Sequence, residues 1–299
     1  MPAVGTPSFD QLSIFLAVVD TGSFAGAARK TGRAVSVISY GISNLEAQLG
    51  LALFEREGTK KPQLTDAGAA ILSEARAIAA RMDGLRARTR GLLEGLEAEI
   101  RLVVDVLFPM ARLAILLREF NDRFPTVSLR LHTEGLGAVL QLILNGEADI
   151  GIGGPLVTEH DSIEHIRAGS VQLVPVAAPD HPLGMAETLG PGAGRDHIQL
   201  VLTDRSPLTQ GRDFSVNSPH TWRLADMASK HALLREGIGW GNMPVHMIEG
   251  DLVAGTLTRL FMPDSGAQEY RLSALWRRDT QPGPASAWLI NQIASPDKR

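Results

Sequence analysis

Apolar residues in the first 50 positions recur with the spacing of short amphipathic helices. Leu12, Phe15, Leu16 and Val19 follow an i, i+3, i+4, i+7 pattern, which predicts a helix over 8–21. Ser8 is expected to cap it and Gly22 to end it. A second helix follows Ser23, and a third runs to Gly50 with Ile38, Ile42, Leu45 and Leu49 facing inward. Three short helices with a tight turn before the third are typical of a helix-turn-helix.

The outward face of the third helix is the one that would enter the major groove of DNA. Removing the inward positions leaves five candidates for base contacts: Val35, Ser36, Ser39, Tyr40 and Ser43. Hydroxyl groups bond phosphates or base edges, and a valine contacts a thymine methyl. A solvent-exposed helix in an ordinary bundle would carry the same small polar residues.

Within residues 51–65, two short apolar stretches flank a Gly- and Lys-bearing tip, which suits a β-hairpin wing. A solvated turn is the alternative. Basic side chains here and on the second helix are the candidates for phosphate contacts: Arg29, Lys30, Arg33, Arg56, Lys60 and Lys61.

A heptad pattern of apolar positions follows Thr65, which is expected to cap a long helix. Its steps alternate between four and three residues through Ile71, Ala75, Ile78, Met82, Leu85, Thr89, Leu92 and Leu96. So narrow an apolar strip favours pairing of this helix with the same helix of a second copy. The residues expected to form the dimer contact are Ile71, Ala75, Ile78, Met82, Leu85 and Leu92. Packing on the chain's own body is the alternative. Glycines place a hinge near 91–99.

From residue 99 the pattern changes to alternating strands and helices, which predicts a parallel sheet. Strands are expected at 100–104, 127–133, 149–152, 171–177, 197–202 and 271–276, with helices at 109–123, 136–145, 224–235 and 285–293. The expected domains are 1–65 for DNA binding, 66–97 for the linker helix and 98–299 for two α/β lobes. The lobes are expected at about 98–168 with 270–299, and at 169–269.

Ligands of open α/β sheets bind beyond the carboxyl ends of the strands. The candidate effector-binding residues at those ends are Asp105, Leu107, Thr133, Glu134, Leu136, Gly153, Thr203, Asp204 and Trp222. Asp105 is either a helix N-cap or an acceptor in the cleft. If it lines the cleft, a neutral or cationic effector is favoured, with Glu134 and Asp204 acting in the same sense. Trp222 is either a pocket wall or part of the core.

The cysteine content, the net charge and the lack of long apolar runs exclude several classes of protein. The 299 residues have no Cys, which excludes a disulfide scaffold and a Cys nucleophile, and the net charge of −4 argues against a protein that coats nucleic acid. Residues 1–65 carry six basic and five acidic residues, whereas 98–299 carry 18 and 23. The N-terminus lacks a signal-peptide pattern, and no apolar run approaches the ~18 residues that span a bilayer. We expect a cytoplasmic protein with no membrane partner.

A gap-free run of about sixty residues combines these features: Ala27-Ala28-Arg29-Lys30, Val37-Ile38-Ser39, Ile42, Leu45-Glu46, Leu49-Gly50, Leu53-Phe54, Arg56, Leu64-Thr65 and Ala67-Gly68. The run resembles the winged helix-turn-helix of LysR-type transcriptional regulators. It departs at Val35, where Gln is typical, and at Tyr40, where Arg is frequent. The body is similar to the family's periplasmic-binding-protein-like effector domain, at Phe124-Pro125, Glu134-Gly135, Asp149-Ile150-Gly151-Ile152 and Gly237-Ile238-Gly239. The resemblance implies antiparallel linker-helix pairing, dimers that often form tetramers, double-stranded DNA with a two-fold site, and a small-molecule effector.

Catalytic and cofactor motifs are missing from the sequence. Gly151-Ile152-Gly153-Gly154 is not a dinucleotide fingerprint, and neither a P-loop nor a G-x-S-x-G elbow occurs. His160 and His165 are five residues apart, which does not place both on one helical face for a metal. We therefore expect no enzyme activity, no cofactor and no metal. The competing hypothesis is a cytoplasmic solute-binding or enzymatic α/β protein whose N-terminal helices serve only assembly.

Overall fold

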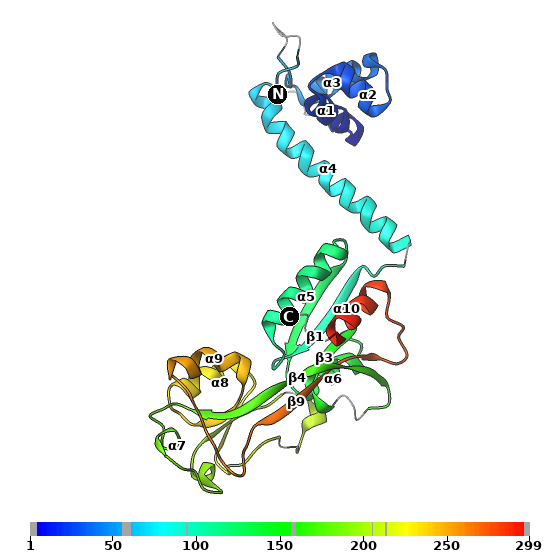
Figure 1. Cartoon of the computed structure of the whole chain (residues 1–299). Helices are drawn as coiled ribbons and strands as arrows, with labels where there is room; N and C mark the ends of the chain where they lie inside the picture. Colours follow the sequence, from blue (N-terminus) through cyan, green and yellow to red (C-terminus); the bar gives the residue numbers. More distant parts are fainter. Residues whose placement is uncertain are drawn as a thin grey trace. The chain divides into compact units, whose positions relative to one another are not determined.

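The computed structural model describes residues 5–55, 61–93, 95–156, 160–204, 206–212 and 214–295. It divides into two compact units, Met1–Arg90 and Gly91–Arg299, each of which is described by itself (Figure 1). Among the described residues no single helix is long and apolar enough to cross a membrane. Helices α1 and α2 pass that test of length and composition only as a pair, bent by 119°.

Three short helices form the core of the first unit: α1 (Phe9–Thr21), α2 (Phe24–Thr31) and α3 (Val35–Leu49). The predicted caps are confirmed. Ser8 forms a capping box with Gln11, and Ser23 accepts a hydrogen bond from the Gly26 N–H. Gly22 and Gly50 end their helices in the left-handed conformation, which glycine adopts without steric cost. Phe15, Ile38 and Leu45 are fully buried between the helices.

The base of the predicted hairpin is present after α3. Phe54 and Leu64 form an antiparallel bridge, and the Glu55 N–H donates to the Gln63 carbonyl at 2.8 Å. One oxygen of the Glu46 carboxylate accepts the N–H groups of Leu53 and Phe54, at 2.7 and 3.2 Å. This pair of bonds fastens the start of the hairpin to α3. The tip, with Arg56 and Lys60, lies outside the described residues.

The long helix α4 spans Asp66–Leu93, and the Thr65 hydroxyl caps it by accepting the Gly68 N–H at 2.9 Å. The heptad pattern is longer than the helix. Leu96 lies beyond it, after Gly95 at φ 78°, and packs against the core of the second unit. The last apolar position of the pattern therefore belongs to a different core, and the helical strip ends at Leu92.

One mixed sheet organises the second unit, with the strand order β2-β1-β3-β9-β4-β7-β5-β6 and β8 paired to β4. Its strands are β1 (Glu99–Asp105), β2 (Ser128–Glu134), β3 (Ile150–Gly153), β4 (Ile163–Ala177), β5 (Gln199–Leu202), β6 (Thr221–Leu224), β7 (Trp240–Pro244), β8 (Thr258–Arg259) and β9 (Gln268–Arg277). Strands β1, β2 and β3 pair in parallel, as do β5, β6 and β7. The pairs of β9 with β3 and β4, and of β4 with β7 and β8, are antiparallel. The prediction of a parallel sheet is thus right within each group of three and wrong for the sheet as a whole.

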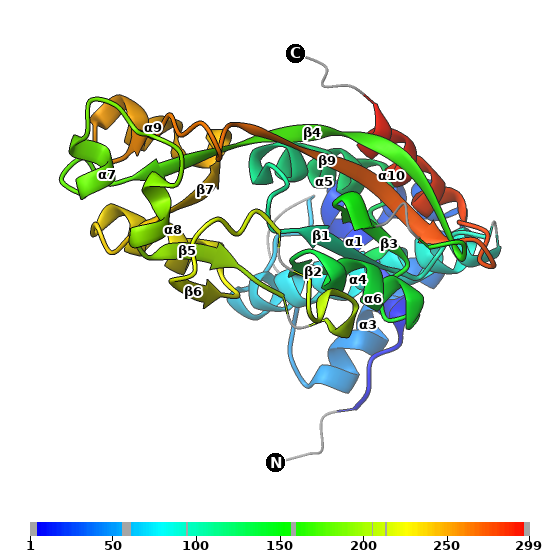
Figure 2. The same ribbon diagram turned by 90° about the horizontal axis from the view of Figure 1, so that it is seen from below.

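Strands β4 and β9 are longer than predicted and continue through both lobes (Figure 2). Their register shifts between Arg167 and Gly169, where Gly169 adopts φ 109°. Such a bulge bends a strand pair and leaves the ladder continuous on either side. The first lobe contains β1–β3, and the second contains β5–β7.

Helices α5 (Met110–Arg123), α6 (Gly137–Leu144) and α10 (Pro284–Ala294) belong to the first lobe, and α7 (Pro182–Met185), α8 (Met227–Arg235) and α9 (Val245–Ala254) to the second. The helix predicted over 224–235 begins later, at Met227. Asp226 caps it there through the N–H groups of Ala228 and Ser229, and residues 221–224 form β6 instead. One buried apolar cluster runs through both lobes, from Ile100 and Phe120 to Leu200 and Met243.

We expect Glu46→Ala to destabilise the first unit by about 1–3 kcal/mol, because two amide groups lose a charged acceptor. Glu46→Gln keeps an acceptor oxygen at this position and should cost less. Hydrogen exchange of the Leu53 and Phe54 amides, followed by NMR, measures the effect directly. Unchanged protection of both amides in Glu46→Ala would show that the carboxylate does not hold the hairpin.

Candidate functional site

The exposed face of α3 carries all five residues predicted to contact bases, which are Val35, Ser36, Ser39, Tyr40 and Ser43. Tyr40 is the most open of the large side chains on the helix, at 69% exposed. The opposite face is buried through Ile38, Ile42 and Leu45. Val37 is also exposed, at 44%, and was not predicted, since a valine beside the inward Ile38 gives no signal of exposure. The arrangement leaves a small, mostly polar surface on the second helix of the helix-turn-helix.

Basic residues near this face differ in their surroundings. Arg29 is exposed, whereas Lys30 pairs with Asp20 at 3.0 Å and Arg33 makes two 2.7 Å hydrogen bonds to Asp10. The Arg33 guanidinium holds the pKa of Asp10 below its usual range. Exposed pairs of this kind contribute only ~0–1 kcal/mol, so a phosphate group can compete with them. Lys61 is exposed, and Arg56 and Lys60 lie outside the described residues.

The strip of apolar residues on α4 divides into two parts. Ala75 is 1% exposed, and Ile71 packs beside it against the helix-turn-helix core. These two residues are therefore used within the chain, which corrects their assignment to a partner helix. Met82 is half-buried, whereas Ile78, Leu85 and Leu92 are 43%, 59% and 52% exposed. The exposed strip, Ile78–Leu85–Leu92, keeps a seven-residue spacing.

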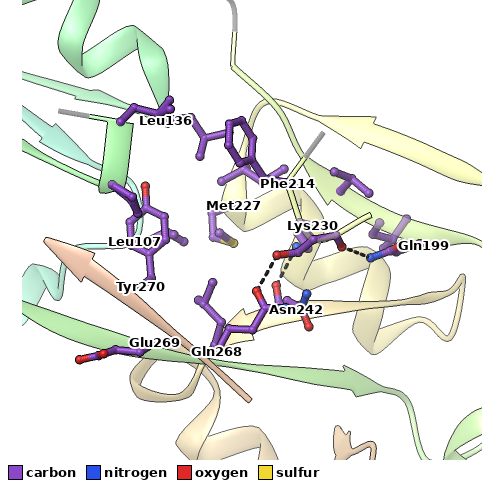
Figure 3. A pocket seen from close by; sticks show the side chains of 17 residues that line it. Leu107, Leu136, Gln199, Phe214, Met227, Lys230, Asn242, Gln268, Glu269 and Tyr270 are labelled. Carbon is purple, nitrogen blue, oxygen red and sulfur yellow. Dashed lines mark hydrogen bonds between the residues drawn. The ribbon is translucent and has the colours of Figure 1, made fainter. Parts of the chain in front are cut away.

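The second unit contains a mostly apolar pocket of about 240 Å³ between its lobes (Figure 3). Its wall includes Leu107, Leu136, Pro155 and Leu156 from the first lobe, Gln199, Leu200, Val201, Leu202, Phe214, Ser215, Met227, Lys230 and Asn242 from the second, and Leu173, Gln268, Glu269 and Tyr270 from the two shared strands. Only Leu107 and Leu136 were among the predicted effector-binding residues. Leu136 has φ 48°, a strained conformation for a non-glycine residue that occurs mainly at functional sites.

Asp105 takes neither of its two predicted roles. It is fully buried and does not cap α5, which begins at Met110. Its carboxylate accepts the Leu107 N–H at 2.9 Å and the Tyr270 hydroxyl at 2.7 Å. Burial raises the pKa of Asp105 to about 6, and the hydrogen bonds that it accepts act against this rise. Asp105 therefore lies behind Tyr270, where it positions pocket-lining residues without itself lining the pocket.

Four further predicted residues, Thr133, Glu134, Thr203 and Asp204, line a smaller hollow of about 190 Å³ with Gly135 and Ala225. Asp204 is engaged structurally, because its carboxylate accepts the Ala138 N–H at 2.8 Å and the Thr209 hydroxyl. Gly153 is buried in β3, and Trp222 is 47% exposed on the terminal strand β6. Neither lines the pocket, and the exposure of Trp222 also excludes a place in the core.

Lys230 is the pocket residue that the sequence analysis missed. It is 4% exposed, and its Nζ donates to the Asn242 backbone carbonyl at 2.7 Å. Burial lowers its pKa to about 8. A signal was present in the sequence: Lys230 stands three residues after Met227 and four before Leu234, both buried on α8. A lysine at an inward position of an amphipathic helix marks a site that contains a buried charge.

Among the described residues, no group of three or more His, Asp or Glu side chains is arranged to hold a metal ion. Residues 157–159, next to His160, are outside that part of the chain. His160 accepts the Ser162 N–H through its ring, and His165 is exposed on β4. The two histidines that the sequence analysis considered are therefore not brought together with carboxylates into a site.

Comparison with known families covers both units. Residues 9–69 match the bacterial regulatory helix-turn-helix protein of the lysR family, and residues 93–295 match the LysR substrate binding domain. The chain belongs to the LysR-type transcriptional regulators. The two matches leave residues 70–92, which make up most of α4, between them.

Individual relatives are similar over nearly the whole chain. The HTH-type transcriptional regulator AceR of Acinetobacter baumannii is 28% identical over 297 residues, covering 95% of each chain. The regulator PunR of Escherichia coli is 26% identical and covers 94% of this chain and 91% of its own. Among solved structures, an OxyR variant of Corynebacterium glutamicum has a TM-score of 0.53 at 20% identity, covering 97% of this chain and 92% of its own. This structural similarity supports the fold, with its mixed-sheet effector domain.

The depressed pKa of Lys230 predicts a pH-dependent stability. The folded protein binds this proton less tightly than the unfolded chain, whose lysines titrate near ~10.4. The free energy of unfolding should therefore rise as pH increases from about 8 to about 10.5, by up to ~3 kcal/mol relative to Lys230→Met. Urea titrations of both proteins across this range test the difference. A constant difference between them would mean that Lys230 has an ordinary pKa in the folded state.

Proposed function

We propose that this chain is a sequence-specific DNA-binding regulator controlled by a small-molecule effector that binds between the two lobes. The observation that carries the proposal is the exposed polar face of α3, on the second helix of a helix-turn-helix that belongs to a LysR-type chain. The mostly apolar pocket between the lobes of the second unit supports the effector part. We assign residues 1–65 to DNA binding, 66–97 to the linker and 98–299 to the effector domain.

Direct readout of bases is assigned to the α3 face. Val35, Ser36, Ser39, Tyr40 and Ser43 supply hydroxyl groups and one branched apolar side chain, which suit base edges and thymine methyls. Phosphate contacts are assigned to Arg29, Lys30, Arg33, Arg56, Lys60 and Lys61, so that affinity depends strongly on salt. Lys30 and Arg33 would exchange their exposed carboxylate partners for phosphates on binding.

Assembly is assigned to the exposed strip on α4. Ile78, Leu85 and Leu92 lie at heptad spacing, and their exposed apolar surface is removed from water when two such helices pair. A two-fold dimer matches a two-fold DNA site, and a tetramer provides two such dimers. We place this regulator in the cytoplasm, where its DNA and a metabolite effector meet.

Effector control requires that the ligand prefer one arrangement of the assembly over another, because a ligand with equal affinity for both shifts nothing. The pocket meets a structural condition for such a preference. Its wall includes residues of both lobes, for example Leu107 and Leu136 of the first and Leu200 and Lys230 of the second. Closing the lobes on a ligand would therefore change their relative position.

Base readout is tested with Ser39→Ala and Tyr40→Ala. Each should weaken binding to DNA from immediately upstream of the protein's own gene by about tenfold or more, because a good base contact is worth ~1–3 kcal/mol. Binding to scrambled DNA should change far less. Fluorescence anisotropy at two salt concentrations measures both affinities, with the exposed Ser73→Ala as the control. Equal losses on both DNAs would refute the assignment of these residues to bases.

The phosphate contact from the hairpin is tested separately with Lys61→Ala. This variant should weaken binding to all sequences alike and reduce the dependence of log affinity on log salt by about 0.9, the value for one phosphate contact. The same anisotropy titrations, repeated over a range of salt concentrations, give the slope. A slope equal to that of the wild type would remove Lys61 from the DNA interface.

Pairing through α4 is tested with Leu85→Glu. A charge at the centre of the exposed strip would lose its hydration in a helix pair, so the dimer dissociation constant should rise by about tenfold or more. Ala80→Glu is the matched control, because residue 80 is exposed and lies roughly 200° around the helix from Ile78. Sedimentation equilibrium measures the assembly of each variant. If both variants assemble like the wild type, the strip is not the interface.

A further inference from the structure

The lysines of this chain are distributed unevenly. Of its 29 basic residues, 24 are arginines and five are lysines, and Lys230 is the sole lysine between positions 62 and 297. The second unit therefore uses arginine almost everywhere that it exposes a cation, and its one lysine within the described part is buried. An ammonium is a compact charge that is costly to bury unless an anion or several acceptors surround it.

Lys230 has no carboxylate partner among the described residues. Its Nζ makes one hydrogen bond, to the Asn242 backbone carbonyl at 2.7 Å, and no ion pair within 4.0 Å. Two of its three N–H groups therefore have no acceptor within the part of the chain that the structure describes. The lysine extends from α8 toward β7, beside Met227 and Asn242 (Figure 3). Lys230 is also one of the residues that line the pocket.

The two described carboxylates nearest the pocket, those of Glu269 and Asp105, do not pair with Lys230. Glu269 lines the wall, but its carboxylate pairs with Arg271 at 3.3 Å and Arg167 at 3.6 Å. Asp105 lies behind Tyr270 and accepts that residue's hydroxyl group. Among the described residues that line the pocket, Lys230 is therefore the buried charged group without a counter-charge.

The amide side chains that line the pocket also differ in whether the described residues satisfy their hydrogen bonds. Gln199 donates to the Ser215 carbonyl and accepts the N–H groups of Asn217 and Ser218. Gln268 accepts the Ser215 hydroxyl at 2.5 Å. The Asn242 side chain, in contrast, is buried with an oxygen that has no hydrogen-bond partner in the described structure. Lys230 and Asn242 are adjacent, and the pocket wall includes both residues.

We propose that the pocket takes a small organic carboxylate with an apolar body, whose carboxylate pairs with Lys230. The inference rests on the proposed function, because it names the chemical class of the effector. Leu107, Leu136, Leu200 and Phe214 supply the apolar wall, and the volume of about 240 Å³ suits a ligand of metabolite size. This reverses the expectation of a neutral or cationic effector, which depended on Asp105 lining the cleft.

Binding of matched probes to the full-length protein tests the charge requirement. The probes are benzoate, hexanoate and 2-hydroxyhexanoate, with benzamide, hexanamide and hexylamine as their uncharged and cationic counterparts. We expect at least one carboxylate to bind about tenfold or more tightly than its amide, by calorimetry. Lys230→Met should remove this preference, and Arg118→Met, which deletes an exposed cation of the same unit, should keep it.

The lysine itself provides a second readout. Protein labelled with 13C-lysine has five Cε signals, and Lys230→Met assigns the one of interest. Carboxylate binding should raise the pKa that this signal reports, because the anion stabilises the ammonium. The inference is overturned if amides or hexylamine bind as tightly as the carboxylates. It is also overturned if no carboxylate at about 10 mM moves the Lys230 signal.

Failure of this inference is distinguishable from failure of the regulator proposal. If the protein binds its upstream DNA specifically but no carboxylate reaches Lys230, the effector class is wrong and the regulator assignment stands. If a carboxylate binds at Lys230 but the protein has no affinity for DNA at low salt, the pocket chemistry stands and the regulator assignment fails.

Discussion

The antiparallel pairing of β4 with β9 is the interaction on which the second unit depends. It runs from Ile163 opposite Arg277 to Leu173 opposite Gln268, with a single register shift at Gly169, so the same pair of strands joins both lobes. Three parallel strands extend from each side of this pair. The pocket lies against the same pair, because Leu173, Gln268 and Tyr270 form part of its wall. A shift of one residue in this register would turn their side chains to the opposite face of the sheet.

Around the pocket, several groups are held in states that do not favour stability. Burial raises the pKa of Asp105 to about 6 and lowers that of Lys230 to about 8, and Leu136 adopts φ 48°. The two charged groups have different tasks. The Asp105 carboxylate accepts hydrogen bonds from the protein itself, from the Leu107 N–H and the Tyr270 hydroxyl. The Lys230 ammonium lines the pocket and makes one hydrogen bond to the described residues, which leaves two of its donors without an acceptor there. A buried charge with unused donors is the pattern expected of a group that meets its partner in a ligand.

In the first unit, the spacing of apolar and capping residues predicts most of the local structure. The three helices, their caps at Ser8 and Ser23 and the exposed face of α3 follow from spacing and capping chemistry within a few residues. The strip on α4 shows the limit. Ile71 and Ala75 belong to the same heptad pattern as Leu85, yet they pack on the helix-turn-helix core, and Leu96 lies beyond the helix in the second unit. A heptad pattern states which residues share a face, and it does not state what covers that face.

The sequence by itself determined the helix-turn-helix, the long linker helix and the division of the body into two α/β groups, because these depend on neighbours within one or two turns or strands. It missed β6, whose residues 221–224 were predicted as the start of a helix. Only the tertiary structure decided that the sheet is mixed, since β4 meets β9 nearly a hundred residues later and pattern does not encode the direction of that pairing. It also decided that Asp105 lies behind Tyr270 while Lys230 lines the pocket. Burial of a polar side chain depends on residues distant in sequence, and the charge of the pocket therefore emerges only when the lobes are assembled.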